Sequence, residues 1–365
     1  MKHNPPDLVL LFVTITLLVI GLIVVTSASA PESLSHTGGS SVFYYGLRQL
    51  FFAVVGIGMM LIAMKFPYRQ LRKFTIPLTL VSLALLILVL FLADPRKGST
   101  RWFELGLLGL NVQPSEIAKL AVIMVLAHYI SEINTGIKNF VVGVFIPLVF
   151  VSIICLLILL EPDLGTTIVI FATFVMMLFA GGANLFHLGC LGLVGVGMGI
   201  VLVVTEPYRF QRLIAFWNPW KDPKGDGWQI IQSLYALGSG GPLGLGLGMS
   251  RQKFNYLPEA HTDYIFSILG EELGLLGTIT VIILFFFMAW RGYKIAISTK
   301  EPYGRMLAVG ITSYLVFQAI LNIGVVTSSL PVTGITLPFL SYGGSSLMIS
   351  LVGIGILLNI SKNTE

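Results

Sequence analysis

The run LVLLFVTITLLVIGLIVV at residues 8–25 decides the fold class of this chain. It holds no charged residue, and about 20 consecutive apolar residues are what a helix needs to cross a bilayer. Lys2 before the run and Ala28-Ser29-Ala30 after it resemble a secretory signal with its cleavage site. The run is long for the apolar part of a signal, and many similar runs follow it. We therefore predict an uncleaved first transmembrane helix.

The composition of the whole chain extends this prediction. Of its 365 residues, 55% are hydrophobic and only 11% are charged, and the mean hydropathy is +0.90. Because a soluble domain carries about 25% charged residues, this chain cannot cover a water-exposed surface. We predict an all-α, polytopic membrane protein that forms one transmembrane domain over residues 1–365. About ten transmembrane helices are expected, at 8–28, 46–64, 75–93, 113–131, 140–160, 164–181, 186–205, 263–290, 305–326 and 343–361.

The distribution of Lys and Arg predicts the orientation, because short loops rich in these residues stay on the cytoplasmic side. The N terminus, the even-numbered loops and the C terminus carry most of them. The opposite short loops hold only Arg48, Arg96, Lys97 and Arg101. Both termini are therefore expected to be cytoplasmic, with a large extracytoplasmic loop at 206–262 between the seventh and eighth helices.

That large loop is cationic, in a chain whose net charge is +5. A cationic surface just outside a bilayer suits a phosphate-bearing ligand, and anchoring to anionic membrane lipid is the alternative. Nucleic acid is not an expected partner, since no basic helix with interleaved aromatic residues occurs. The candidate substrate-binding cations of the loop are Arg209, Arg212, Arg251 and Lys253.

Charged residues inside apolar helices are costly and usually face a partner or a cavity. Glu116 and Lys119 lie three residues apart, on one face of the fourth helix. They either neutralise each other or contact substrate. Glu161 and Asp163 flank Pro162 at a break that is either a hairpin or one interrupted helix. Asp163 either caps the following helix or pairs with Lys119.

The stretch YLPEAHTDYIF at residues 256–266 is the most informative. Glu259, His261 and Asp263 gather where the large loop becomes the eighth helix. Thr262 or Asp263 is expected to cap that helix, and the helix dipole is expected to keep Asp263 ionised. A carboxylate at the membrane surface, below a cationic loop, can act as a general base toward a lipid-linked substrate.

Two glycine-rich segments are less specific. No strand precedes residues 238–248, so a folded loop close to the lipid is expected rather than a nucleotide-binding loop. Residues 340–346 open the last helix, where small residues either permit close helix packing or expose N–H groups toward a phosphate. Ser341 and Ser345 are the candidates for that contact.

With these motifs the chain resembles the SEDS family of bacterial shape, elongation, division and sporulation proteins. The resemblance covers nearly the whole chain. Residues 322–329 and Glu259-Ala260-His261 are more similar to the FtsW and SpoVE branch than to RodA. The motifs that carry the resemblance are QPSE with Lys119 at 113–119, PDLGT at 162–166, WQIIQS at 228–233, LPE through Thr262-Asp263 at 257–263, GEELG at 270–274, LPVTG at 330–334, and LPF followed by SYGGSS at 337–346.

The resemblance implies a peptidoglycan glycosyltransferase that polymerises lipid II at the outer face of the bacterial cytoplasmic membrane, in division or sporulation. Asp263 would be the catalytic base. Glu116, Lys119 and Asp163 would line a polar cavity, and Arg48 would lie near it. The reaction would invert the sugar configuration, form a β-1,4 linkage and release undecaprenyl pyrophosphate. The loop cations would stabilise that leaving group.

A cognate class B penicillin-binding protein and other divisome proteins are the implied partners. No metal-ligand spacing is visible in the sequence, although a divalent cation, Mg²⁺ or Mn²⁺, bridging Asp263 and the pyrophosphate is one expectation. Two other functions stay open. A lipid II flippase would use Glu116 and Lys119 as a polar path, although the chain lacks the internal repeat of many transporters. A non-catalytic scaffold would only bind the penicillin-binding protein.

Overall fold

The computed structural model describes residues 5–92, 101–105 and 110–363. All ten predicted long helices are present in this part of the chain, and most of their ends lie within a few residues of those expected. The exceptions are the eighth, predicted to end at 290 and ending at Ser298, and the fifth, predicted to begin at 140 and beginning as an α-helix at Ile146 after a separate turn at 141–145. The all-α membrane fold is thus confirmed. The ten helices are α1 (Leu8–Ala28), α3 (Tyr44–Lys65), α4 (Leu71–Leu92), α5 (Pro114–Ile133), α6 (Ile146–Leu160), α7 (Leu164–Gly181), α8 (Leu185–Val204), α11 (Ile265–Ser298), α12 (Pro302–Val326) and α13 (Gly344–Ser361).

Shorter elements complete the described structure. Among the described residues, a two-stranded antiparallel sheet between α4 and α5 departs from the all-α prediction, with Phe103 opposite Val112. Its strands read apolar–polar–apolar, which is the period of two that a strand requires, but they are too short to stand out in sequence. The remaining elements are α2 (Ala30–His36), η1 (Tyr68–Gln70), β1 (Phe103–Leu105), β2 (Leu110–Val112), η2 (Asn134–Lys138), η3 (Val141–Phe145), α9 (Pro207–Trp217), η4 (Pro219–Lys221) and α10 (Trp228–Gly240).

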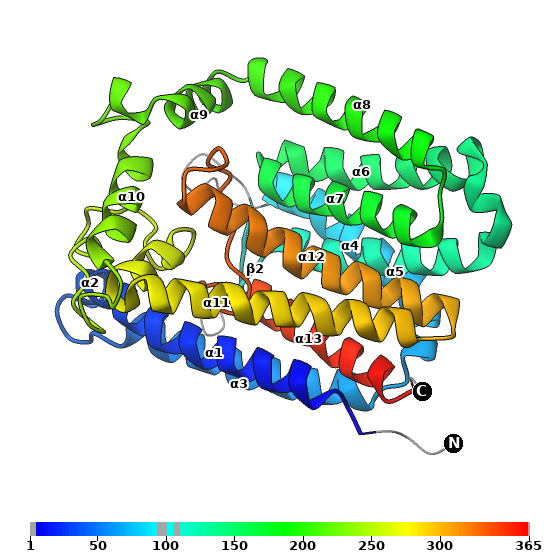
Figure 1. The fold of residues 1–365 in the computed structure, drawn as a ribbon, viewed down its shortest axis with the longest axis horizontal. Helices are drawn as coiled ribbons and strands as arrows, with labels where there is room; N and C mark the ends of the chain where they lie inside the picture. Colours follow the sequence, from blue (N-terminus) through cyan, green and yellow to red (C-terminus); the bar gives the residue numbers. More distant parts are fainter. Residues whose placement is uncertain (1–4, 93–100, 106–109, 364–365) are drawn as a thin grey trace.

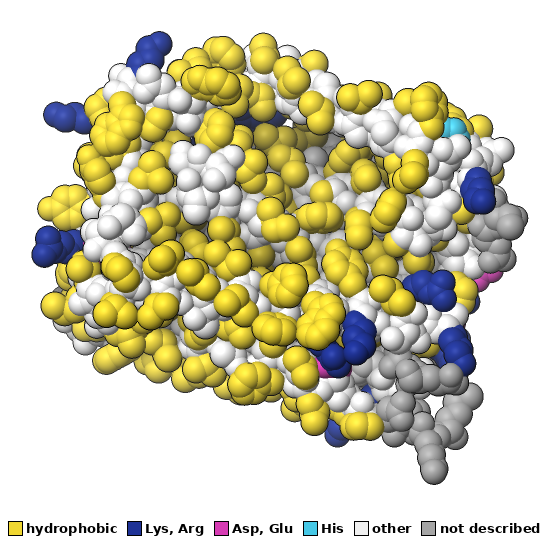
Figure 2. Space-filling model, in the orientation of Figure 1, with side chains coloured by type: hydrophobic (Ala, Val, Ile, Leu, Met, Phe, Trp, Pro, Cys, Tyr) yellow, Lys and Arg dark blue, Asp and Glu magenta, His cyan; other side chains and the backbone are white. Residues whose placement is uncertain are grey.

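The long helices run roughly side by side (Figure 1), so the molecule has two opposite ends. Both termini lie at one of them, the terminal end, and α9 and α10 lie at the other, the loop end. Apolar side chains cover the broad face, whereas Lys and Arg gather toward the two ends (Figure 2). In the described residues, nine helices are long and apolar enough to cross a membrane. Which end faces the cytoplasm stays a prediction.

The centre of the bundle is formed by α5, α12 and α13. Helix α12 packs against α5, α7 and α11, and α13 packs against α3. Helix α5 is the predicted span that falls outside the nine apolar ones. Its charged residues Glu116 and Lys119 are buried against these neighbours, as expected of polar groups that must avoid lipid.

The break at residues 161–163 is a hairpin, because α6 and α7 pack against each other on either side of it.

Helix α8 is packed less closely than the other long helices. It contacts α7 and α9 but is mostly exposed along its length, and it lies apart from the bundle in Figure 1. The helices α9 and α10 that follow show that the large loop at 206–262 is folded rather than extended.

The glycines of residues 238–248 allow this loop to approach α11 closely. The Leu245 N–H donates to the Glu271 carbonyl at 2.9 Å, and the Gly246 N–H donates to the Glu272 carbonyl at 3.0 Å. A side chain at Gly244 would collide with the Glu272 carbonyl. Helix α11 itself breaks at Gly274, which has a φ of 66° that favours glycine. The predicted folded loop is thus present.

Candidate functional site

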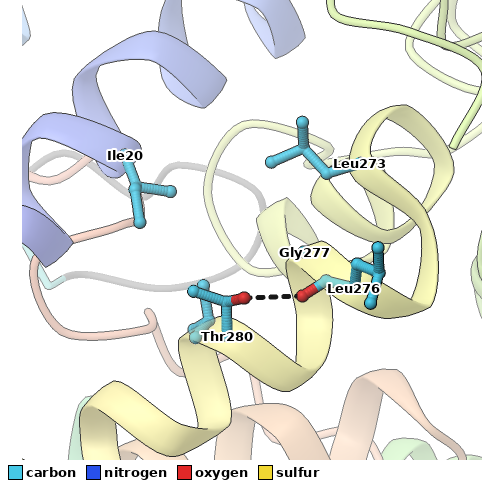
Figure 3. Close-up of a pocket in the computed structure, with 6 residues that line it drawn as sticks. Ile20, Leu273, Leu276, Gly277 and Thr280 are labelled. Atoms are coloured by element: carbon cyan, nitrogen blue, oxygen red, sulfur yellow. Dashed lines mark hydrogen bonds between the residues drawn. The ribbon is translucent and has the colours of Figure 1, made fainter. Parts of the chain in front are cut away.

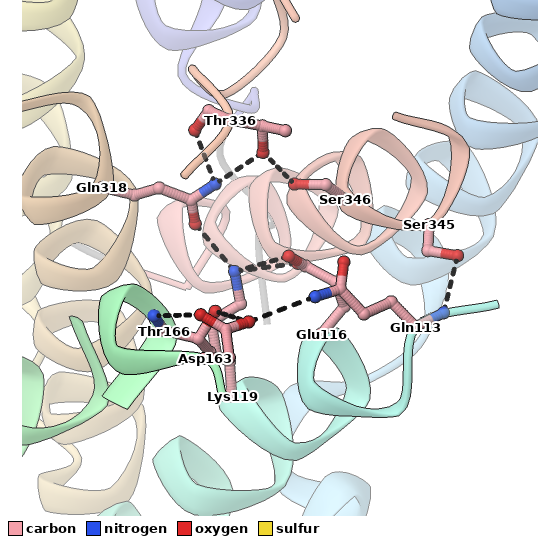
Figure 4. A network of polar contacts seen from close by, with 9 residues as sticks. All are labelled: Gln113, Glu116, Lys119, Asp163, Thr166, Gln318, Thr336, Ser345 and Ser346. Carbon is pink, nitrogen blue, oxygen red and sulfur yellow. Dashed lines mark hydrogen bonds and ion pairs between the residues drawn. The ribbon is translucent and has the colours of Figure 1, made fainter. Parts of the chain in front are cut away.

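A polar network crosses the interior of the bundle (Figure 4). The Lys119 Nζ lies 2.8 Å from Glu116 Oε2 and donates to Gln318 Oε1 at 2.7 Å. Both charged side chains are almost fully buried. Of the two interpretations left open by the sequence, the geometry favours mutual neutralisation of Glu116 and Lys119, braced by α12.

Asp163 caps α7. Its Oδ1 accepts from the Thr166 N–H at 3.0 Å, and its Oδ2 accepts from the Thr166 hydroxyl at 2.9 Å. Gln113 Nε2 also donates to Oδ2, at 3.4 Å. Among the described residues, the hydrogen-bond partners of the Lys119 ammonium group are Glu116 and Gln318. Of the two roles expected for Asp163, the structure therefore favours capping of α7 over a direct ion pair with Lys119.

The serines at the start of α13 bind the backbone of neighbouring segments. The Ser345 hydroxyl donates to the Asn111 carbonyl at 2.8 Å, and the Ser341 hydroxyl accepts from the Leu337 N–H at 2.7 Å. Both side chains are buried. Gly344 packs directly against the Phe52 ring. This arrangement favours the packing interpretation of the segment over a phosphate contact.

Asp263 lies at the loop end, two residues before α11. The expected capping role is wrong: α11 begins at Ile265, and the cap residue is Tyr264, which makes no side-chain cap bond. The Asp263 carboxylate instead lies beside Gly334. Asn322 Nδ2 donates to the Asp263 carbonyl at 2.7 Å and to the Ile335 carbonyl at 2.6 Å. Asn322 therefore ties the Asp263 backbone to the segment that carries Gly334.

The electrostatic prediction for Asp263 is also corrected. Burial, followed by the negative charge of Glu259, raises the pKa of Asp263 to about 7. Asp163 acts in the same direction, while Arg101 and Arg212 oppose it. Because Asp263 does not cap α11, the helix dipole stabilises its charged form only weakly. The loss of hydration on burial is therefore the largest effect on its pKa. A carboxyl with a pKa near neutrality is well matched to a general base.

The turn before Asp263 is fixed by its own polar residues. The Thr262 hydroxyl donates to Glu259 Oε2 at 2.9 Å, and Glu259 adopts a left-handed φ of 54°. His261 is buried, with its Nδ1 3.2 Å from Glu32 Oε2 of α2, and its ring lies 5.2 Å from that of Tyr45. Glu259 and His261 therefore position the turn through these side-chain contacts.

The predicted cations lie in different places. Arg212 is exposed and acts on Asp263. Arg209 donates to the Tyr208 hydroxyl at 2.8 Å, Arg251 is exposed near α10, and Arg48 donates to the Tyr44 hydroxyl at 3.1 Å.

Sequence reasoning missed Arg101 as a site residue. Its guanidinium donates to the backbone carbonyls of Glu161, at 3.0 Å, and Pro162, and its charge acts on Asp263. The Glu161 side chain beside it is fully buried, and that burial raises its pKa to about 8. The contact joins residues 60 positions apart, which no local sequence pattern reports.

Lys253 does not belong to the cationic surface predicted for it. It is buried, with its Nζ 3.0 Å from Glu272 Oε1 and 3.0 Å from the Ser27 hydroxyl of α1. Glu271 accepts from the Ser250 hydroxyl at 2.5 Å and from the Arg251 N–H at 3.1 Å. Both acidic residues of the GEELG motif therefore hold the glycine-rich loop on α11.

Ser27→Ala tests this structural role of Lys253. The Ser27 hydroxyl donates to Glu272 Oε1 at 2.6 Å in a partly buried bond, and losing a hydrogen bond to a charged group costs about 1.5–3 kcal/mol. We expect lower thermal stability and faster proteolysis within residues 241–256, with the substrate KM unchanged. The exposed Ser35→Ala is the control. A raised KM without loss of stability would instead favour a ligand role for Lys253.

Two other features bear on the site. An apolar pocket of about 310 Å³ between α1 and α11 is lined by Ile20, Leu273, Gly277 and neighbours (Figure 3), and its lining contains no titratable group. It is therefore a lipid-facing feature rather than a reaction centre.

The described residues also contain no cluster of three or more His, Cys, Asp or Glu side chains suited to a metal ion.

Comparison with known proteins gives full-length matches. A family model described as cell cycle protein, covering FtsW, RodA and SpoVE, matches residues 8–365. Stage V sporulation protein E of Bacillus subtilis is 46% identical over 99% of this chain and 98% of its own length. The probable peptidoglycan glycosyltransferase FtsW of Trichlorobacter lovleyi is 45% identical, covering 98% and 94%.

Solved structures agree with these sequence matches. A chain from a peptidoglycan synthase complex that coordinates polymerization and crosslinking superposes with a TM-score of 0.79, at 29% identity and 98% coverage of both chains. The rod shape determining protein RodA of Thermus thermophilus gives a TM-score of 0.72, at 27% identity, covering 98% and 97%. The higher identity to SpoVE and FtsW confirms the predicted branch.

Proposed function

This chain belongs to the FtsW, RodA and SpoVE family, and from that premise we propose that it is a peptidoglycan glycosyltransferase with Asp263 as its catalytic base. The observation that carries the proposal is the position of Asp263. Its carboxyl lies at the loop end of a multi-pass membrane protein, has a pKa of about 7, and is within the field of Arg101 and Arg212. This is the arrangement that a base acting on a lipid-linked anionic substrate requires.

The proposed reaction joins two lipid-linked saccharides. The 4-hydroxyl of the GlcNAc of lipid II attacks C1 of the MurNAc at the end of the growing chain. Asp263 accepts the hydroxyl proton, the new C–O bond forms, and the bond from C1 to the pyrophosphate breaks. Undecaprenyl pyrophosphate leaves with the electron pair and needs no proton, so one base is sufficient. Attack from the face opposite the leaving group converts the α-linked donor into a β-1,4 linkage.

The arginines are proposed to stabilise the departing pyrophosphate. Arg212 and Arg101 are the two whose charges reach Asp263, and a guanidinium forms paired bonds with phosphate oxygens. Three further arginines are proposed to attract and orient the anionic substrate. They are Arg209 and Arg251, on the large loop that also carries Arg212, and Arg48 at the start of α3. The buried ion pair of Glu116 and Lys119 is proposed to support the site from the interior of the bundle, together with Asp163.

The setting of the reaction follows from the family. We propose that the loop end faces outward from the cytoplasmic membrane, that the termini are cytoplasmic, and that a class B penicillin-binding protein and divisome proteins are partners. A match to a chain of a peptidoglycan synthase complex supports such a partner. Asp263 would hold a divalent cation if one is bound, and the cation would supply charge stabilisation for the departing pyrophosphate. No further group of acidic, His or Cys ligands gathers for it among the described residues.

Glu259→Gln is expected to shift the pH dependence of polymerisation. The base must be ionised, so wild-type activity should fall as the pH drops through about 7, the pKa of Asp263. The charge of Glu259 raises that pKa, and removing it should move the acid limb to lower pH. Initial rates between pH 5 and 9 measure the shift. An acid limb that stays in place, or one near pH 4 in the wild type, would contradict this role.

The linkage formed by the enzyme tests the proposed chemistry. The polymer made from labelled lipid II should be degraded completely by a muramidase, which cleaves β-1,4 bonds after MurNAc. A product that resists this digestion would exclude the proposed inverting transfer.

A flippase and a scaffold are the competing functions. The charges at Glu116 and Lys119 that suggested a polar path are paired and buried, which favours the enzyme. A scaffold would tolerate neutralisation of Asp263 as long as docking of the penicillin-binding protein survived.

A further inference from the structure

The loop end carries a groove that, apart from Arg251, the proposed reaction does not use. Its volume is about 630 Å³, within the range of small-ligand sites. One wall comes from α10 and the other from the segment that follows the glycine-rich loop. The six lining residues are Trp228, Gln232, Arg251, Gln252, Phe254 and Tyr256.

The groove presents aromatic faces beside amide groups with spare hydrogen-bonding capacity. Trp228 Nε1 donates to the Tyr256 carbonyl at 2.7 Å, which fixes the two walls together. Phe254 and Tyr256 are more than half exposed. Gln232 is only 7% exposed, yet its amide has no hydrogen-bond partner among the described residues. The buried Oε1 of Gln252 likewise lacks one there.

This combination of groups matches a saccharide. A pyranose ring has an apolar C–H face that packs on an aromatic ring and a rim of hydroxyl and acetamido groups. An amide can donate to and accept from such groups, and the buried Gln252 Oε1, which lacks a partner among the described residues, would gain one from a ligand. Of the six lining residues only Arg251 is charged, and none is acidic. Its guanidinium suits a carboxylate carried by the sugar.

One wall of the groove is followed directly along the chain by the catalytic turn. Tyr256 and Asp263 belong to one short segment, in which the Leu257 N–H donates to the Gln252 carbonyl at 3.0 Å and the Tyr264 N–H donates to the Glu259 carbonyl at 3.2 Å. A glycan chain extended at Asp263 therefore has a saccharide-compatible surface a few residues away along the same hydrogen-bonded segment.

We propose that this groove is a binding site for the nascent glycan strand, an alternating saccharide with carboxylate-bearing substituents. The inference rests on the proposed glycosyltransferase function and adds a subsite to it. By holding sugars already joined, the groove keeps the growing chain on the protein between additions.

Binding can be measured without turnover. The probe is a soluble tetrasaccharide of alternating GlcNAc and MurNAc, without lipid or pyrophosphate, titrated into the full-length Asp263→Asn protein in detergent. We expect saturable binding, weakened at least tenfold when Gln232→Ala or Tyr256→Ala is added. Tyr235→Ala is the matched control, because Tyr235 is an exposed aromatic of α10 that does not line the groove. Thermal melting confirms that each variant is folded.

The outcomes separate this inference from the function on which it rests. Absence of saturable binding, or equal affinity in the groove variants and the control, overturns the groove assignment even if the wild type polymerises lipid II. Failure of the wild type to polymerise, with tetrasaccharide binding intact, instead counts against the proposed function. In otherwise wild-type protein, Tyr256→Ala should shorten the glycan product and Tyr235→Ala should not. Unchanged product length in the first variant would also contradict the proposal.

Discussion

Asp263→Asn is expected to abolish glycan polymerisation, lowering the rate by about 100-fold or more, while the protein stays folded. Asparagine has nearly the same size as aspartate and cannot accept the hydroxyl proton. The Asp263 backbone contacts to Asn322 do not involve the carboxylate, so the fold of the turn should survive. Initial rates with labelled lipid II measure the loss.

The same variant should be more stable than the wild type at high pH. The native pKa of Asp263, about 7, lies above its ordinary value of 3.8, so the folded state binds this proton more tightly than the unfolded state. The wild type therefore loses stability as the pH rises between these values. Asparagine carries no such cost, and its gain in Tm should be larger at pH 8 than at pH 5. A variant that retains activity, or melts lower at pH 8, would contradict the account.

Lys119→Met is expected to cause the largest loss of stability. It would leave the Glu116 carboxylate buried in the bundle without its cation, and breaking a buried ion pair from one side costs about 3–5 kcal/mol. Gln318 Oε1 would lose its donor as well. Thermal melting in detergent and recovery of folded protein by gel filtration measure the effect.

The double variant Glu116→Gln/Lys119→Met separates structure from catalysis. It removes both charges, so most of the lost stability should return. Lys65→Met, at an exposed position near the terminal end of α3, is the control for loss of a lysine. A double variant as unstable as Lys119→Met would contradict mutual neutralisation. One that folds but stays inactive would favour substrate contact by Lys119.

The bundle was predictable because each long helix is an apolar run, and the membrane requirement acts on every residue of such a run. Helix α5 was found in sequence despite its charges because Glu116 and Lys119 share one face. The β1–β2 hairpin was not found, since three-residue strands give too short a pattern. The folded loop at 238–248 was predicted from its glycines, but its contact with α11 was not, because those glycines act through close approach to a distant segment.

The site was predictable where spacing alone sets the contact. The Glu116–Lys119 pair and the capping role of Asp163 follow from separations of three residues. Arg101 and Lys253 required tertiary information, because their partners are Glu161 in one case and Ser27 and Glu272 in the other. The raised pKa of Asp263 was not predicted, because burial outweighs the effect of a helix that begins two residues later.

This chain is proposed to polymerise lipid II through Asp263. The most direct test incubates the purified protein, alone and with its cognate class B penicillin-binding protein, with fluorescent lipid II in detergent micelles, where no second leaflet exists for a flippase to serve. The account predicts a ladder of glycan products on a gel for the wild type and none for Asp263→Asn. Wild-type protein that makes no polymer with its partner present, or an Asp263→Asn ladder equal to the wild type, would contradict it.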